Sequence, residues 1–201
     1  MGAFWLWKDY IALMFFPLID TPTSGSIVIN GVNLKQLSDT GSADFRRDNL
    51  GFIFQEYFLL DSLTIRENIS VPLTLQKLPH KKIKKCAKFS RTLWHCLSVD
   101  KYPNELSGGQ RQRASAARAI VKQPSILFAD EPTGALDSNS ATELLKTLKE
   151  ANEELHTTIL MVTHDAYAAS FANRILIFKD GSIIRELLKQ DADRRTFYET
   201  I

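Results

Sequence analysis

Two adjacent carboxylates, Asp130 and Glu131, follow an apolar run of the sequence, SILFA at residues 125–129. The run is typical of a buried β-strand, and two like charges at its end repel each other. A divalent cation would remove this repulsion. At the carboxyl edge of a sheet an Asp can hold Mg²⁺, directly or through water, while a neighbouring Glu polarises an attacking water. Taken alone, the pair is better explained as a solvated strand end. The segments around it therefore decide whether it is a metal site.

The sequence LSGGQ, residues 106–110, lies about twenty residues before this pair and leads into an Ala-rich helical run. Ser107 is a good helix N-cap, and Gly108 and Gly109 leave backbone N–H groups unobstructed at the start of the helix. A helix N-terminus of this kind is a ready anion site. A Gly-Gly turn is weak evidence by itself, and it gains weight from the segments around it.

Three segments, LSGGQRQRASAARAI, LFADEPTGALD and MVTHD, resemble the ATP-binding subunit of ABC transporters in that family's order and spacing. The resemblance covers about residues 21–181. It implies an α/β fold, a RecA-like P-loop NTPase core that here is N-terminally truncated, with a helical subdomain at about residues 60–120. The whole chain, residues 1–201, would be one such ABC ATPase domain, and its ligands would be ATP and Mg²⁺.

The resemblance also assigns roles to single residues at the expected sheet edge. Gln55, which follows GFIF, matches the glutamine that touches the metal or the attacking water and reports to the membrane partner. Asp130 matches the metal-binding aspartate and Glu131 the general base. His164 matches the histidine that contacts the γ-phosphate. We therefore expect Gln55, Asp130 and His164 to cluster at the carboxyl edge of the sheet.

A second set of matching residues acts across a dimer in the family. Asp137 ends the D-loop, which crosses the dimer interface. The signature residues would bind the γ-phosphate of ATP that the opposite subunit holds: Ser107, Gly108, Gly109 and Gln110. Two chains must then meet head to tail, and Ser107 is predicted to lie too far from Glu131 of its own chain to share one phosphate.

The stretch FIFQEYFLLDSLTIRENISVPL narrows the resemblance to a branch of the family. This branch exports antimicrobial peptides and macrolides or releases lipoproteins, and the bacitracin-type exporters of Gram-positive bacteria are the most similar group within it. The resemblance implies a transmembrane permease and a second ATP-binding subunit as partners, no nucleic acid, and a peripheral position on the cytoplasmic face of the bacterial membrane. The transported substrate stays open.

The phosphate loop of the family, G-x-x-x-x-G-K-[ST], occurs nowhere in the 201 residues. Relatives carry it about twenty residues before the segment TPTSG, where this chain begins MGAFWLWKDY. Residues 1–20 are thus expected to be an aberrant N-terminus in place of the Walker A loop. A divergent but genuine apolar N-terminus is the alternative.

We predict that the gene encodes the missing loop one base out of frame. Trp has the single codon TGG, so Trp5 before Leu6 forces a glycine codon in the shifted frame, and Trp7 before Lys8 forces another. The shifted reading can spell SGSGKTT. Sequencing of the gene should show a run coding for GSGK[ST] in that frame, with the frame restored before Asp20. A gene in which neither other frame encodes a phosphate loop refutes the prediction.

The elements that must position these residues follow from composition and periodicity. The chain has a net charge of +2, is 44% hydrophobic and 24% charged, and so predicts one globular domain rather than a disordered chain or a protein that binds nucleic acid by bulk charge. The apolar run at residues 11–19 is too short for a membrane span. Two cysteines without metal-ligand spacing favour a reducing compartment.

Strands and helices are expected around the chemical residues. Apolar periodicity predicts a helix at residues 138–155 between strands at 125–129 and 158–163, which makes a βαβ unit. Residues 72–99 read as a helical insertion. A short strand at residues 26–31, closed by Asn30-Gly31, and another at 50–54 are also expected, with a final hairpin at 174–178 and 181–184.

Two alternatives to an active transporter subunit follow from the same motifs, and the sequence favours only the first. A catalytically inactive subunit could lend LSGGQ to an intact partner, because the phosphate loop is missing. A soluble ABC protein of repair or translation would need a tandem second cassette or long insertions, and 201 residues hold neither.

Overall fold

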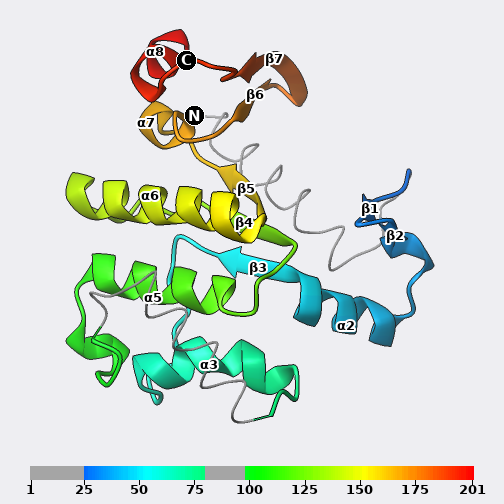
Figure 1. Ribbon diagram of the computed structural model, residues 1–201, viewed down its shortest axis with the longest axis vertical. Helices are drawn as coiled ribbons and strands as arrows, with labels where there is room; N and C mark the ends of the chain where they lie inside the picture. Colours follow the sequence, from blue (N-terminus) through cyan, green and yellow to red (C-terminus); the bar gives the residue numbers. More distant parts are fainter. Residues whose placement is uncertain (1–24, 80–97) are drawn as a thin grey trace. The chain divides into compact units, whose positions relative to one another are not determined.

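The computed structural model describes residues 25–79 and 98–201 (Figure 1). The expectations for the N-terminal segment and for most of residues 80–99 therefore lie outside the described residues. The chain divides into two units: residues 47–162 form one, and residues up to 46 together with 163–201 form the other. Each unit is described by itself.

A parallel sheet of order β3-β4-β5 forms the centre of the larger unit. Its strands are β3 (Leu50–Ile53), β4 (Ile126–Asp130) and β5 (Thr158–Val162). Ile53 pairs with Ala129, and Asp130 pairs with Val162. The three strands are those expected from the apolar runs, with ends that differ by one residue. Their parallel order aligns the carboxyl ends of the strands, and Asp130 is the last residue of the middle one.

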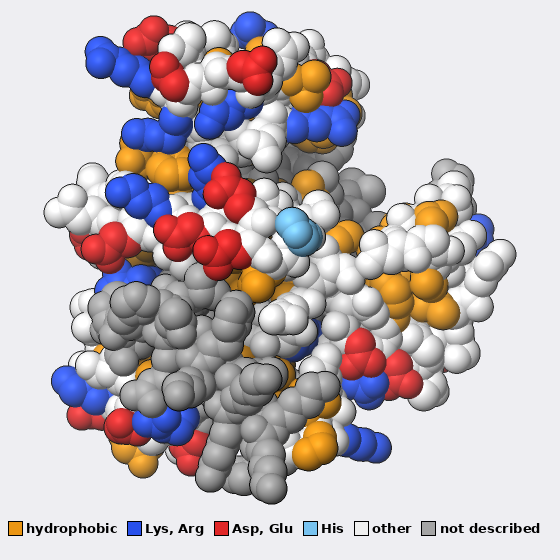
Figure 2. All heavy atoms as spheres, viewed as in Figure 1, with side chains coloured by type: hydrophobic (Ala, Val, Ile, Leu, Met, Phe, Trp, Pro, Cys, Tyr) orange, Lys and Arg blue, Asp and Glu red, His pale blue; other side chains and the backbone are white. Residues whose placement is uncertain are grey.

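Helix α6 (Ser138–Leu155) connects β4 to β5 and has the bounds that its periodicity predicts. The side chains that it buries are the apolar ones in the predicted stripe: Ala141, Leu144, Leu145, Leu148 and Ala151. Charged side chains gather over its outward side (Figure 2). The βαβ unit of the sequence analysis is confirmed.

Helix α5 (Gly108–Ile120) and helix α3 (Ile65–Leu75) pack against each other in the same unit (Figure 1). The predicted start of the helical insertion at Pro72 is wrong, because α3 begins seven residues earlier. Thr64 and Glu67 form a capping box there: the Thr64 side chain accepts from the Glu67 backbone N–H, and the Glu67 carboxylate accepts from the Thr64 N–H. Pro72 lies inside the helix. A 3₁₀ turn, η3 (Pro103–Glu105), precedes α5.

Gly51 of β3 lies where the sheet and the end of α5 approach each other closely. A Cβ at this position would lie 2.7 Å from Leu127 Cδ1 and 2.8 Å from the Ala119 carbonyl oxygen. We expect Gly51→Ala to lower the free energy of unfolding by about 1–3 kcal/mol, because a backbone carbonyl cannot give way as a flexible side chain can. Urea unfolding measures the change. The control is Gly41→Ala in a helix, where only side-chain atoms of Leu37 and Ser38 are near; an equal loss there contradicts the packing argument.

Lys122 follows α5 and is half-buried. Its ammonium donates to the Arg47 carbonyl oxygen. Burial, opposed in part by the nearby Asp48 carboxylate, lowers the pKa of Lys122 to about 8. An unfolded lysine has a pKa of about 10.4, so between the two values the unfolded chain binds more protons than the folded chain, and stability rises with pH.

We expect this rise in stability to disappear when Lys122 is replaced. The free energy of unfolding of the unchanged protein, relative to Lys122→Met, should increase as the pH rises from about 8 toward 10. Denaturant unfolding at several pH values tests this. The matched variant Lys146→Met, at an exposed lysine of α6, should follow the unchanged protein. If the stability of Lys122→Met has the same pH dependence as that of the unchanged protein, the folded state does not lower the pKa of this lysine.

The smaller unit contains two hairpins and short helices. Strands β1 (Val28–Ile29) and β2 (Val32–Asn33) pair around Asn30 and Gly31, which both have positive φ. The expected strand that Asn30-Gly31 closes is present as β1, and the Asn-Gly pair makes a hairpin turn into a second strand, β2, which was not expected from the sequence. A 3₁₀ turn, η2 (Leu34–Gln36), and helix α2 (Asp39–Asn49) follow, and α2 crosses into the larger unit.

The second hairpin confirms the expected C-terminal pair. Strands β6 (Arg174–Lys179) and β7 (Ser182–Leu188) are antiparallel. Helices α7 (Ala166–Ala169) and α8 (Arg194–Thr200) contact each other. The Arg194 guanidinium lies 5.0 Å from the centroid of the Tyr167 ring and 4.9 Å from that of Phe171. In the described parts of the chain, no helix is long and apolar enough to cross a membrane.

Candidate nucleotide-binding site

The chain turns sharply where β4 ends. Asp130, which is half-buried, closes the strand, and Glu131 follows with φ at 41°, in the left-handed region. This conformation costs a non-glycine residue about 1 kcal/mol or more. Backbone hydrogen bonds hold it: the Glu131 N–H donates to the Val162 carbonyl at 2.9 Å, and the Gly134 N–H donates to the Glu131 carbonyl at 3.0 Å. The turn therefore fixes the two carboxylate-bearing residues at the end of the sheet.

Gln55 comes from the loop after β3 and meets this turn. Its Nε2 lies 3.5 Å from the point that a Cβ on Gly134 would occupy, and Glu131 Cβ lies 3.7 Å from the same point. The structure thus brings together Gln55 and Glu131, two of the residues singled out in the sequence. Gly134 has no side chain, and this leaves the space in which Gln55 and Glu131 approach each other.

The signature segment forms the first turn of α5. The Ser107 hydroxyl oxygen accepts from the Gln110 N–H at 3.3 Å, and the Ser107 N–H donates to Gln110 Oε1 at 3.0 Å. The side chain of Gln110 is therefore used in a capping box. The N–H groups of a first helical turn have no carbonyl partner within the helix, so this end of α5 favours an anion.

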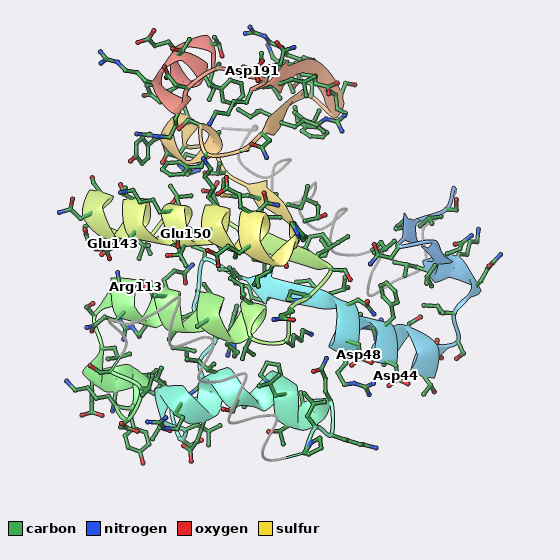
Figure 3. All side chains as sticks on the ribbon, viewed as in Figure 1. Asp44, Asp48, Arg113, Glu143, Glu150 and Asp191 are labelled. Carbon is green, nitrogen blue, oxygen red and sulfur yellow. The ribbon has the colours of Figure 1, made fainter. Side chains whose placement is uncertain are left out.

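Both glycines of the signature are places of close approach. A Cβ on Gly109 would lie 2.6 Å from Ser140 Oγ of α6, and a Cβ on Gly108 would lie 3.0 Å from the Tyr57 hydroxyl. The signature turn is consequently packed between the loop after β3 and the start of α6. Arg113 of α5 and Glu143 of α6 strengthen this arrangement with an ion pair of 2.6 Å (Figure 3).

Asp137 caps α6. Its carboxylate accepts from the backbone N–H groups of Ser140 at 3.0 Å and Asn139 at 3.1 Å. These hydrogen bonds, the Ser140 bond first, lower the pKa of Asp137 below its usual value. The side chain is exposed. Within the chain the Asp137 side chain caps helix α6, and its role at a dimer interface stays a prediction.

His164 is exposed and follows β5 by two residues, just before Asp165, whose carboxylate caps α7. It belongs to the smaller unit. The expected meeting of His164 with Gln55 and Asp130 therefore stays a prediction, as does the separation of Ser107 from Glu131.

The oxygen donors at the sheet edge suit a magnesium ion. Among the described residues, no group of three or more His, Cys, Asp or Glu side chains could enclose a metal. Mg²⁺ does not need such a cage, because it commonly uses one or two carboxylates together with waters and substrate phosphates. The carboxylate of Asp130 and the amide oxygen of Gln55 fit that donor set.

Two residues of α5 that the sequence analysis did not single out hold the loop that carries Gln55. The buried Gln112 amide donates to the carbonyl oxygens of Phe54 and Pro132, and the Arg118 guanidinium donates to that of Tyr57. A signal for Gln112 existed. It lies one helical turn before Ala116, on the Ala-lined face that α5 buries, where a polar side chain needs a partner.

A parallel sheet with carboxylates at its carboxyl edge, next to a capped helix N-terminus that favours anions, is the arrangement of a nucleotide-binding α/β ATPase. The family model described as "ABC transporter" matches residues 13–134. The chain belongs to the ABC transporter family. The match begins before residue 21, where the motif-based resemblance starts, and so includes part of the apolar run at residues 11–19.

Curated relatives agree with this assignment. The chain is 52% identical to "Bacitracin export ATP-binding protein BceA" of Halalkalibacterium halodurans over 184 residues, which are 91% of this chain and 73% of the relative. It is 40% identical to "Macrolide export ATP-binding/permease protein MacB" of Campylobacter jejuni over 91% of this chain and 28% of that longer protein. The bacitracin-type and macrolide branch of the family is confirmed.

A solved structure shares the fold. The chain is similar to the dimeric ATP-binding cassette MJ0796 in a post-hydrolysis state bound to ADP and Pi, with a TM-score of 0.78 and 35% identity, over 90% of this chain and 81% of that chain. The predicted fold class is confirmed.

Proposed function

We propose that this protein is an ATP-binding subunit of an ABC exporter, which couples ATP binding and hydrolysis to the export of a peptide or drug through a membrane permease. The observation that carries the proposal is the approach of Gln55 to Glu131 next to Gly134, at the sheet edge where Asp130 ends β4. The similarity to a bacitracin export subunit and to a macrolide exporter supports the substrate class.

Each group has a defined part in this chemistry. Glu131 would accept a proton from the attacking water, and Gln55 would orient that water. Asp130 and Gln55 would hold Mg²⁺, which when bound supplies charge neutralisation on the phosphate oxygens. The N-terminus of α5 would bind the γ-phosphate of the ATP that the second subunit holds, through backbone N–H groups and the Ser107 hydroxyl. His164 would contact the γ-phosphate of the ATP bound at the sheet edge of its own chain.

The alternative is a catalytically inactive subunit that lends its signature turn to an intact partner. The observation that favours it is the lack of G-x-x-x-x-G-K-[ST] in the sequence, because the lysine and the hydroxyl of that loop hold and neutralise the β- and γ-phosphates. Under both functions the partners are a permease and a second ATP-binding subunit, and the protein is located at the cytoplasmic face of the bacterial membrane.

Co-purification tests the partner set. The tagged chain is expressed together with a bacitracin-type permease and an intact ATP-binding subunit, and the membranes are solubilised in detergent. We expect the tag to recover both partners. Gly51→Ala, which should loosen the larger unit, should reduce recovery more than Gly41→Ala does. Recovery of the chain without the permease would contradict the proposed function.

A further inference from the structure

Gln112 lies in the larger unit where helix α5, the loop after β3 and the turn after β4 meet. It is 1% exposed, on the face of α5 that packs against the sheet. Its Nε2 donates one hydrogen bond to the Phe54 carbonyl at 3.1 Å and another to the Pro132 carbonyl at 2.8 Å. Phe54 directly precedes Gln55, and Pro132 directly follows Glu131. One amide group therefore holds the backbone next to both residues.

The free-energy cost of burying this amide indicates that its two hydrogen bonds are needed at this position. Burial of an amide is costly unless it is hydrogen-bonded, and Gln112 Oε1 has no hydrogen-bond partner among the described residues. An apolar side chain of similar size would avoid that cost. A buried glutamine with an unsatisfied oxygen makes sense if its two N–H donors are needed where they are.

Arg118, one and a half helical turns further along α5, holds the other end of the same loop. Its guanidinium donates to the Tyr57 carbonyl at 3.0 Å and to the Phe58 carbonyl. Phe58 has φ at 44°, a left-handed conformation that needs such support. Gln55 thus lies on a short loop that α5 fixes on both sides. Because α5 begins with the signature turn, a movement of that turn is a movement of the helix that fixes the loop.

We propose that Gln112 is a positioning residue, which sets the separation of Gln55 from Glu131 and ties it to the position of the signature helix. The proposal rests on the proposed function for the chemical roles of Gln55 and Glu131. The geometry itself does not depend on ATP. A test of the separation in the absence of nucleotide can therefore fail or succeed independently of the proposed function.

The experiment measures the distance between spin labels on the exposed positions 56 and 135, neighbours of Gln55 and of Gly134, after Cys86 and Cys96 are replaced by Ser. In Gln112→Leu both N–H donors are lost, and we expect the distance distribution to become about twofold broader in the folded protein, since the two carbonyls lose their common restraint. The control is Ile120→Val, which removes buried volume from the same helix without touching either carbonyl.

The variant Gln112→Glu separates positioning from mere structural support. Burial raises the pKa of a carboxyl group, so at high pH a carboxylate would face two carbonyl oxygens and the distribution should broaden, whereas protonation at lower pH restores one donor and should narrow it again. Gln112→Leu should show no such recovery. If Gln112→Leu and Ile120→Val lower stability alike and both keep the narrow distance of the unchanged protein, Gln112 only supports the fold and the proposal is wrong. A broad distribution that is insensitive to pH in Gln112→Glu also overturns it.

Discussion

Purified alone, the chain should release phosphate from ATP no faster than the background in buffer containing Mg²⁺. The expected loss is large because phosphoryl transfer depends almost entirely on positioning and charge neutralisation, and the sequence has no phosphate loop to supply the lysine and the Mg²⁺-binding hydroxyl. Glu131 and Gln55 can act on a water only if a γ-phosphate is held beside them. A phosphate-release assay on the purified chain measures this directly.

The control for contaminating activity is Glu131→Gln, which removes the predicted general base and leaves the shape of the turn. Clear Mg²⁺-dependent turnover that disappears in Glu131→Gln would contradict the prediction, because this chain itself would then be the source of the activity. Turnover that is the same in both proteins comes from a contaminant.

Mixed with an intact relative, the chain should sustain ATP hydrolysis at the site to which it contributes its signature turn, and Ser107→Arg should remove that contribution. Loss of one preorganised donor at a developing charge typically costs about 10²–10³ in rate, and the arginine side chain also fills the space at the helix N-terminus. The measurement is the ATPase rate of the co-purified mixed dimer, in which the partner subunit supplies the phosphate loop.

Two controls separate this effect from loss of folding. Ser107→Asn keeps a good helix N-cap, and its smaller loss of rate isolates the hydroxyl. Thr40→Arg adds the same charge and bulk at an exposed position of α2 and should leave the rate unchanged. If Ser107→Arg leaves both the rate and the assembly of the mixed dimer as they are, the signature turn does not act across the dimer.

Local patterns explain how much of the fold could be predicted. The stripe from Ala141 to Ala151 repeats at helical spacing, and it places α6 correctly because all its information lies within one element. The first strand of the hairpin at residues 28–33 and its Asn30-Gly31 turn were predicted, whereas its second strand, β2, has only two residues and therefore no alternating pattern to detect. Helix α2 was not predicted at all, since it buries no residue and therefore has no apolar stripe to detect.

The site could be predicted only where a motif carries it. The motifs pointed to Ser107, Asp130 and Glu131, and the family resemblance placed Gln55 at the same sheet edge. The spacing of the residues alone does not predict the approach of Gln55 to Glu131 next to Gly134, because it joins segments about 75 residues apart. Gln112 illustrates the same limit. Its burial was predictable from the Ala-rich face of α5, whereas its two carbonyl partners come from loops that only the folded sheet brings together.

A cross-link at position 107 tests the central claim most directly, namely that the signature turn of this chain completes an ATP site on a second subunit. The chain carries Ser107→Cys in a background with Cys86 and Cys96 replaced by Ser, and an intact bacitracin-type subunit carries a single cysteine beside its phosphate loop. We expect a disulfide between the two subunits that forms in the presence of Mg²⁺ and ATP and does not form without nucleotide. Equal cross-linking with and without ATP, or none under either condition, would contradict it.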